Sequence, residues 1–231
     1  GERLGAGGPK AFVPLAGRPM IEWSLEALRG CESVRSIVVA CPPGHDHALG
    51  GDDLEVVDGG ATRSRSVSNA LAAAETELVA IHDAARPLVT PALVDAIVAT
   101  LTADPDASGC IAAAPVVDTI KRTTPHRCSL SVDSTAKEQR KGGGGADRLR
   151  IDGTLDRSTL WAAQTPQVFR AEELRRALAS ADDPDAATDE AMLIEQAGGT
   201  VLIHPVAEPN LKVTTPFDLR IAELLLAERV A

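Results

Sequence analysis

The chain alternates between short apolar runs and longer stretches in which apolar residues recur every three or four positions. Short apolar runs are typical of buried strands, and the longer spacing is typical of amphipathic helices. Because the two kinds of segment follow each other in turn, the pattern predicts an α/β fold with a mostly parallel, Rossmann-like sheet and helices on both faces. Strands are expected at 34–40, 54–57, 77–82, 109–117, 200–206 and 211–215, and helices at 19–30, 66–75, 90–101, 170–180, 188–199 and 216–231.

Residues with preferences for helix ends support three of these helices. Pro19 lies near the start of the first helix and Gly30 lies at its end, where proline and glycine are each favoured. Thr90 is suited to cap the third helix, with Pro91 at its first position, and Pro216 begins the last helix. The ends of these helices are therefore expected close to these residues.

The alternation breaks between Thr123 and Gly153, where the chain is polar, shows no helical period and contains four consecutive glycines. Such a composition is typical of loops and disordered segments. We interpret residues 123–153 as an excursion from the sheet, partly disordered, that is either a plain surface loop or a functional arm. No internal repeat is visible, so residues 1–231 are expected to form one domain.

The composition is that of a protein with a full hydrophobic core, since 44% of the 231 residues are hydrophobic and 24% are charged. The formal net charge of −10 argues against general binding to nucleic acid, whose phosphates need a basic surface. No apolar run reaches the roughly 18 residues of a membrane span, and no signal-peptide core begins the chain. The four cysteines include no C-x-x-C pair, which argues against a zinc site and favours a reduced, cytoplasmic protein.

Polar loops follow four of the expected strands, and each loop carries a cation. In open α/β sheets, ligands bind outside the carboxyl ends of the strands, so these cations are expected to converge on one crevice. A basic crevice in an acidic protein favours an anionic ligand; alternatively, each cation simply decorates a surface loop. The cations concerned are Arg63, Arg65, Arg86, Lys121, Arg122 and Lys212.

Two of these loops carry further chemistry. Gly59 and Gly60 precede a helix, an arrangement that lets backbone N–H groups approach a ligand but that also occurs in ordinary turns. Ser66 is expected either to cap that helix or to contact a nucleotide, with capping the simpler role. Asp83 leaves a buried strand, where a carboxylate must be paired, hydrogen-bonded or bound to a metal. His82 is interpreted as a packed residue of the strand end rather than a general base.

The first ten residues, GERLGAGGPK, combine four glycines with Arg3 and Lys10. They are interpreted as a phosphate-binding loop, with a flexible terminus as the alternative. A lysine point charge and an arginine fork can together neutralise charge that moves during phosphoryl or nucleotidyl transfer. The segment lacks the pattern G-x-x-x-x-G-K-[ST], so it is not a Walker loop.

Seven motifs follow one another along the chain: GERLGAGGPK, VDGGATRSRSV, HDAARP, APVVDTIKR, LDRSTLWAAQTPQVF, TDEA and NLKVTTPFDL. In this order they resemble the motifs of the 2-C-methyl-D-erythritol 4-phosphate cytidylyltransferases of the non-mevalonate isoprenoid pathway. The resemblance runs from Gly1 to about Leu225, apart from the polar excursion. The series is highly specific, although several of its motifs are weak singly.

The resemblance implies a reaction in which the phosphate of methylerythritol phosphate attacks the α-phosphorus of CTP and pyrophosphate leaves. The nucleophile is already an anion, so positioning and charge neutralisation would carry most of the catalysis. Mg²⁺ would be bound mainly through the phosphates of CTP. The resemblance also implies a homodimer, in which the polar segment is a β-arm that reaches into a second subunit.

The resemblance assigns roles by matching positions. Arg3 and Lys10 resemble the pair that stabilises the pentacoordinate α-phosphate, and Arg157 and Lys212 resemble the residues that position the sugar phosphate. Through the arm, Arg157 is expected to serve the partner's site. The positions that resemble further substrate contacts are Gly59, Gly60, Arg63, Ser66, Asp83, Ala84, Arg86, Thr119, Thr165 and Thr188.

Three features depart from the family pattern. The family has a hydrophobic strand and an Ala-Ala-Gly turn before the position aligned with Gly1, and Ala61 stands where many members carry Asp or another polar residue. The excursion is also longer than the usual arm. Two alternatives stay open at this point: the sister activity of a ribitol 5-phosphate cytidylyltransferase, and a non-catalytic nucleotide-binding or dimer-partner protein.

Overall fold

The computed structural model describes residues 8–45, 49, 53–126 and 148–230. The chain divides into two compact units, of which the first comprises Gly1–Ala114 and Ala163–Ala231 and the second comprises Pro115–Ala162. The expectation that the whole chain is one domain stays a prediction. No helix in the described part of the chain is both long and apolar enough to cross a membrane.

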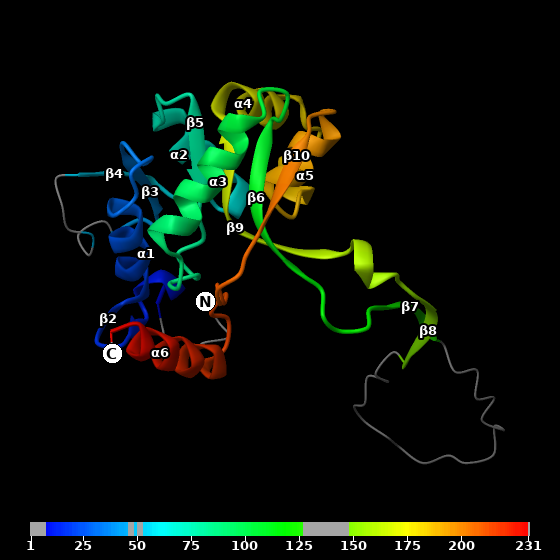
Figure 1. Ribbon diagram of the computed structural model, residues 1–231. Coiled ribbons are helices and arrows are strands. Elements are labelled where there is room, and N and C mark those ends of the chain that lie inside the picture. The colour runs from blue at the N-terminus through cyan, green and yellow to red at the C-terminus, as the bar shows by residue number, and fades with distance from the viewer. Residues whose placement is uncertain (1–7, 46–48, 50–52, 127–147, 231) are drawn as a thin grey trace, which may run out of the picture. The chain divides into compact units, whose positions relative to one another are not determined.

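The main strands of the first unit form two sheets (Figure 1). In the smaller sheet, β3 and β4 pair in parallel. The larger sheet has the strand order β10-β6-β9-β5, in which β10 and β6 are parallel and β5 and β9 are antiparallel. The strands are β1 (Pro14–Leu15), β2 (Arg18–Pro19), β3 (Ile37–Cys41), β4 (Leu54–Asp58), β5 (Leu78–Ile81), β6 (Gly109–Pro115), β9 (Trp161–Arg170) and β10 (Val201–Pro205), with β1 and β2 forming a short hairpin.

Helices cover both faces of these sheets (Figure 1). On one face α1 contacts α3, and on the other face α4 contacts both α2 and α5. The helices are α1 (Met20–Arg29), α2 (Arg63–Ala73), α3 (Pro91–Ala103), α4 (Ala171–Ser180), α5 (Glu190–Gln196) and α6 (Pro216–Val230), with short 3-10 helices η2 (Lys10–Phe12), η4 (Arg157–Thr159) and η5 (Pro184–Ala186).

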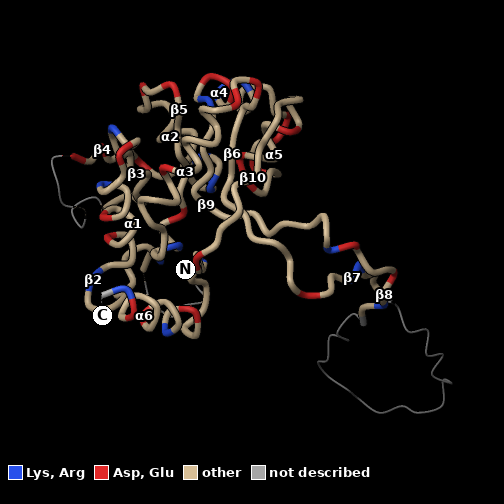
Figure 2. The backbone as a smooth tube through the Cα atoms, viewed as in Figure 1, with Lys and Arg blue, Asp and Glu red and all other residues tan. Residues whose placement is uncertain are grey.

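Strand β6 shows why both faces need a cover. Cys110 and Ala112 pack with Ile97 of α3, whereas Ile111 between them packs with Leu174 of α4. Successive side chains of a strand point to opposite faces, so a strand that is apolar throughout must be buried on both sides. Figure 2 accordingly shows no charged residue on β6, while the charged residues gather on helices and loops.

These elements confirm the α/β fold with helices on both faces. The parallel character of the sheet is confirmed in part, because β5 and β9 are antiparallel. The helix ends expected at Gly30, Thr90 and Pro216 are confirmed. The strand expected at 211–215 is wrong, because these residues form no strand. The N–H of Val213 there bonds to a loop carbonyl rather than to a neighbouring strand.

A cavity of about 550 Å³, lined mainly by apolar side chains, separates the two sheets of the first unit. Its walls come from β3 and β5 and from parts of α1, α2 and α3. Among the described strands, β3 hydrogen-bonds to β4 and β5 hydrogen-bonds to β9, and the two do not pair with each other. The lining also includes the polar residues Arg63, Ser66 and Asp83, so the cavity adjoins the polar groups of the site.

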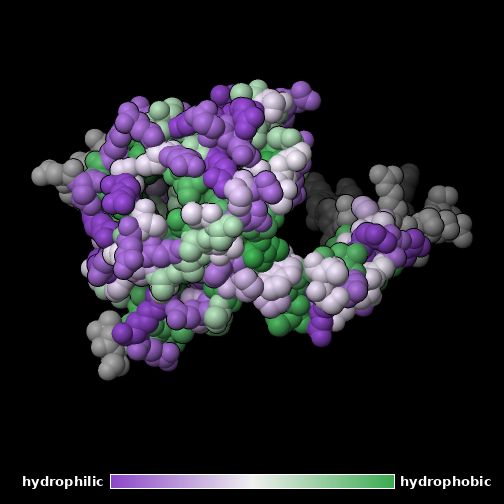
Figure 3. Space-filling model, turned by 45° about the horizontal axis from the view of Figure 1, so that its top comes forward, coloured by the Kyte–Doolittle hydropathy of each residue, from purple (hydrophilic) through white to green (hydrophobic). Residues whose placement is uncertain are grey.

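In the second unit, β7 (Lys121–His126) and β8 (Arg148–Thr154) form an antiparallel ribbon. The ribbon includes both flanks of the polar excursion, whose residues 127–147 lie outside the described part of the chain. Leu149 is 68% exposed and Ile151 is 61% exposed. Figure 3 shows such hydrophobic (green) side chains among the hydrophilic (purple) side chains of this unit. The described residues of this unit therefore leave part of its apolar surface uncovered.

Candidate functional site

Asp83 is the centre of a group of charged side chains just beyond the carboxyl end of β5. Lys212 Nζ donates a hydrogen bond of 2.6 Å to Asp83 Oδ2, and Arg63 Nε lies 3.4 Å from Asp83 Oδ1. The Asp83 side chain is only 16% exposed, so water screens these ion pairs less than it screens surface pairs. The fold thus brings together three of the expected site residues from three distant parts of the sequence.

The pKa values of this cluster follow from its contacts. Burial acts to raise the pKa of Asp83, but the hydrogen bond and charge of Lys212 and the charge of Arg63 outweigh it, so the pKa lies below its ordinary value. Burial and the charge of Lys212 lower the pKa of Lys10, against the opposing charge of Asp83. Lys10, in η2, is therefore within electrostatic reach of the cluster. Among the described residues no carboxylate forms an ion pair with Lys10, which leaves its ammonium available to a ligand.

Glu190 also belongs to the cluster, although it is not among the expected site residues. It begins α5, is 1% exposed, and accepts a hydrogen bond of 2.6 Å from Arg63 Nη1. Burial raises the pKa of Glu190, against the charge and hydrogen bond of Arg63. Arg63 therefore bridges Glu190 and Asp83 and is held from two sides. The sequence signal was weak, because an acidic residue in the first turn of a helix is common at exposed positions.

The loop between β4 and α2 is shaped by Ser66. Gly60 donates its N–H to Ser66 Oγ at 3.0 Å, and the Ser66 hydroxyl donates to the Thr62 carbonyl. A Cβ on Gly60 would lie 2.2 Å from the Cβ of Arg65, so a larger residue does not fit here. The expectation that Ser66 caps α2 is wrong, because the Thr62 side chain accepts from the Arg65 N–H as the N-cap. Ser66 instead holds the turn of Gly59 and Gly60 against the helix.

The hydrogen bonds around His82 indicate its tautomer. Asp83 N–H donates to Thr165 Oγ1 at 3.0 Å, Thr165 Oγ1 lies 3.2 Å from His82 Nδ1, and His82 Nε2 lies 3.2 Å from the Arg86 carbonyl oxygen. All three contacts are satisfied when the Thr165 hydroxyl donates to Nδ1 and Nε2–H donates to the carbonyl, which is a neutral ring. Burial lowers the pKa of His82 to about 4. His82 is therefore a packed residue of the strand end, as expected.

Arg86 is 8% exposed and turned into the protein. Its Nη1 donates 2.7 Å to the carbonyl oxygen of Asn210, and burial lowers its pKa. Its Nε is buried without a partner among the described residues. The visible role of Arg86 is to join the loop after β5 to the segment before α6, so its expected contact with substrate is not evident in this arrangement.

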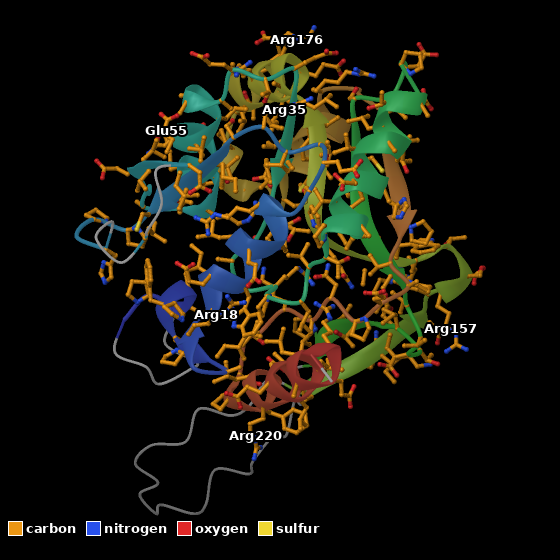
Figure 4. All side chains as sticks on the ribbon, turned by 60° about the vertical axis from the view of Figure 1, so that its left-hand side comes forward. Arg18, Arg35, Glu55, Arg157, Arg176 and Arg220 are labelled. Atoms are coloured by element: carbon orange, nitrogen blue, oxygen red, sulfur yellow. The ribbon has the colours of Figure 1, made fainter. Side chains whose placement is uncertain are left out.

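Thr119 and Arg157 belong to the second unit and are exposed in it. Arg157 donates from Nη1 to the Val117 carbonyl, and Figure 4 labels its side chain on this unit. Lys121 and Arg122, which were expected at the same crevice, contact side chains of β8. The convergence of cations is therefore seen within the first unit only, between Arg63 and Lys212, with Arg86 in the adjoining loop.

The remaining expected residues are spread along the chain. Thr165 is buried within the His82 network, and Ala84 lines the cavity next to Asp83. Thr188 is exposed, and its hydroxyl lies 3.8 Å from the Met192 sulfur. Arg3 lies outside the described residues.

The carboxylates of the cluster are engaged by cations rather than grouped with one another. Among the described residues, no three His, Cys, Asp or Glu side chains gather as a metal-binding group. The two carboxylate oxygens of Asp83 already face Lys212 and Arg63. A Mg²⁺ ion prefers oxygen ligands and commonly takes most of them from substrate phosphates and water.

Several known proteins with similar sequences carry the same or a related name. A family model described as 2-C-methyl-D-erythritol 4-phosphate cytidylyltransferase matches residues 1–228. A protein of that name from Frankia casuarinae is 41% identical over 232 residues, which cover 98% of this chain and 77% of that protein. A bifunctional enzyme IspD/IspF from Anaeromyxobacter dehalogenans is 38% identical over 234 residues, and the chain spans 55% of its length.

Solved structures agree with the sequence matches. The crystal structure of 2-C-methyl-D-erythritol 4-phosphate cytidylyltransferase from Thermus thermophilus superposes with a TM-score of 0.73 at 32% sequence identity, covering 96% of this chain and 95% of the other. The Francisella tularensis protein of the same name gives a TM-score of 0.75 at 26% identity, with the same coverage.

Proposed function

This chain belongs to the 2-C-methyl-D-erythritol 4-phosphate cytidylyltransferase family, and on that premise we propose that it transfers CMP from CTP to 2-C-methyl-D-erythritol 4-phosphate. The products are 4-diphosphocytidyl-2-C-methyl-D-erythritol and pyrophosphate. The observation that carries the proposal is that Arg63 and Lys212 both pair with Asp83, with Lys10 within electrostatic reach of the same carboxylate. These cations lie beyond the carboxyl end of β5, where α/β sheets bind ligands, in a chain whose net charge is −10.

The cluster supports a mechanism based on charge neutralisation. A phosphate oxygen of the sugar phosphate forms a bond to the α-phosphorus of CTP, and the bond to the leaving pyrophosphate breaks. We assign Lys10, together with Arg3, to the α-phosphate and the leaving group, and Lys212 to the incoming phosphate. Because Asp83 already holds the Lys212 ammonium, little reorganisation is needed when the substrates bind. The nucleophile is an anion, so a neutral His82 is compatible with the reaction.

Other first-unit residues are assigned to the nucleotide and the sugar. The turn of Gly59 and Gly60, held by Ser66, presents backbone groups to the cytosine and ribose. Arg63 supports this region by fixing Asp83. The further substrate contacts assigned by family position are Ala84, Arg86, Thr165 and Thr188.

Mg²⁺, when bound, neutralises the triphosphate and polarises the phosphorus under attack. The phosphates of CTP would supply most of its ligands, because both carboxylate oxygens of Asp83 are engaged by Lys212 and Arg63. The cytoplasmic location, which rests on cysteine usage, stays a prediction.

The second unit supports a homodimer. Three apolar side chains of this unit are exposed: Leu149 by 68%, Ile151 by 61% and Val117 by 78%. Removing such side chains from water is favourable by a free energy of roughly 25 cal/mol per Å² of apolar surface. A second copy of the chain is the proposed cover. In that dimer Thr119 and Arg157 would contact the sugar phosphate in the partner's site.

The test is pyrophosphate release from CTP, measured with methylerythritol phosphate, with ribitol 5-phosphate and without any acceptor. The expected result is release that requires methylerythritol phosphate. Faster release with ribitol 5-phosphate would assign the sister activity instead. Failure to bind CTP in calorimetry would contradict any cytidylyltransferase function.

A further inference from the structure

Three segments that carry proposed site residues meet at one buried residue, Asn210, which is 6% exposed. Its Nδ2 donates 3.0 Å to Gln164 Oε1 and 2.8 Å to the Thr165 carbonyl, both on β9. Its main-chain carbonyl accepts the 2.7 Å hydrogen bond from Arg86. Asn210 therefore ties β9 and the loop after β5 to the segment that leads into α6.

Lys212 lies between two fixed points of this segment. Asn210 is the first, two residues before it. The second is Val213, which is 0% exposed and donates its N–H 2.7 Å to the Ala85 carbonyl. The Lys212 side chain, by contrast, is 44% exposed, and it ends at Asp83. A lysine stem has many rotamers, so the position of its ammonium depends on how firmly the backbone at its root is held.

We infer that Asn210 is a positioning residue for Lys212. Its side-chain N–H groups hold residues 210–213 against β9, and this keeps the Lys212 ammonium at Asp83. An amide suits the role because two acceptors face it, the Gln164 side chain and the Thr165 carbonyl. An aspartate would set oxygen against oxygen at the same place, and an alanine would leave both acceptors without their donor.

The first test measures the lysine itself and does not depend on activity. Wild type and Asn210→Ala are treated with trinitrobenzenesulfonate at a limiting concentration, and the labelling rate of Lys212 is read by peptide mass spectrometry. The Lys212 ammonium donates to Asp83 Oδ2 at 2.6 Å, and an amine held in such a contact is less accessible to the reagent than one that moves freely in solvent, so it reacts more slowly. We expect Lys212 to label several-fold faster in the variant, with the exposed Lys121 as the internal reference. An unchanged rate would overturn the inference.

The second test rests on the proposed function and measures turnover in a double-mutant cycle. Asn210→Ala is expected to lower kcat on the order of 10-fold in the wild-type background and by less than about twofold in the Lys212→Ala background. The two effects do not multiply if Asn210 acts through Lys212. Equal factors in both backgrounds would contradict the inference. If wild type itself releases no pyrophosphate, the proposed function fails while the labelling result still decides the role of Asn210.

Two further variants separate positioning from stability. Gln164→Ala removes one acceptor of Asn210 and should shift Lys212 labelling in the same direction by a smaller factor, even if Asn210→Ala does not fold. Ile97→Val shortens a side chain buried in α3 and lowers stability without touching the site. Faster Lys212 labelling in Ile97→Val as well would assign the effect to general loosening and overturn the inference.

Discussion

Around Asp83 and on the β7–β8 ribbon, the same kinds of charged side chain meet very different surroundings. Arg63 bridges Asp83 and Glu190, whose side chains are 16% and 2% exposed. On the ribbon, the side chains of the pair Arg122 and Asp152 are 64% and 43% exposed. Leu149 and Ile151 also face solvent there. The two carboxylates of the first group are largely buried within their own unit, whereas the ribbon is held by the pairing of β7 with β8 and leaves these side chains exposed.

The two regions therefore differ in how firmly they hold their charged side chains before a ligand binds. A buried, partnered cluster holds its geometry before a ligand arrives, which is what electrostatic stabilisation of a transition state needs. An exposed pair contributes little to stability, since water and salt screen it. In the homodimer proposed above, the partner would cover Arg157 and Thr119, whereas the residues around Asp83 are held within the first unit.

The largest effect we expect is on stability. Phe169 is 0% exposed and packs with Ile111, Leu174 and Ile194, so Phe169→Ala should lower the free energy of unfolding by about 3–5 kcal/mol. Leu149→Ala on the ribbon should lower it by less than about 0.5 kcal/mol in dilute protein. Urea denaturation followed by circular dichroism measures both. A large loss for Leu149→Ala that grows with protein concentration would show that a second copy covers the ribbon.

The next effect is on catalysis, and it compares a cation of the cluster with an exposed one. Lys10→Ala should lower kcat by roughly 10²-fold or more while CTP affinity changes little, because the contact is needed most in the transition state. Arg176→Ala removes an exposed cation on α4 that Figure 4 labels, and it should leave kcat unchanged. Steady-state pyrophosphate release and CTP calorimetry measure the two quantities. An equal loss in both variants would point to the net charge of the protein rather than to the cluster.

The comparison also shows where the sequence was informative. Strand β6 and helix α3 were predicted because apolar periodicity is a local property of each element. Glu190 and Asn210 were missed because their burial depends on Arg63 and Arg86, which are 127 and 124 residues away. No local pattern records such contacts. The fold class was therefore readable from the sequence, the loops that carry the site were readable from their motifs, and the buried polar partners that fix those loops were not.

In residues 211–215, by contrast, a local pattern predicts an element that does not form. Leu211 and Val213 alternate with polar residues, which is the local pattern of a strand. The segment instead stays a loop, because Val213 bonds to Ala85 and Asp218 accepts the N–H groups of residues 214 and 215 at the start of α6. Hydrogen bonds to Ala85, far away in the sequence, and to Asp218 in the next helix determine the structure of this segment. Because the same segment carries Lys212 to Asp83, one set of contacts accounts both for the missing strand and for the position of this lysine.

The smallest effect that we expect is on the pH dependence of stability, and it tests whether His82 is neutral in the folded protein, as its contacts indicate. The folded-state pKa of His82, about 4, lies below its ordinary value of 6.5. Between these values the unfolded chain binds a proton that the native protein does not, so stability should rise with pH across this window and reach its full value above pH 6.5. The slope due to this residue is at most about 1.4 kcal/mol per pH unit.

Urea unfolding at several pH values should show this slope in wild type and lose it in His82→Gln. The same substitution at His204, which lies on the edge strand β10, is the matched control. If His204→Gln removes the slope and His82→Gln does not, the neutral, partly buried ring assigned to His82 is wrong, and its hydrogen bonds to Thr165 and Arg86 must be reassigned.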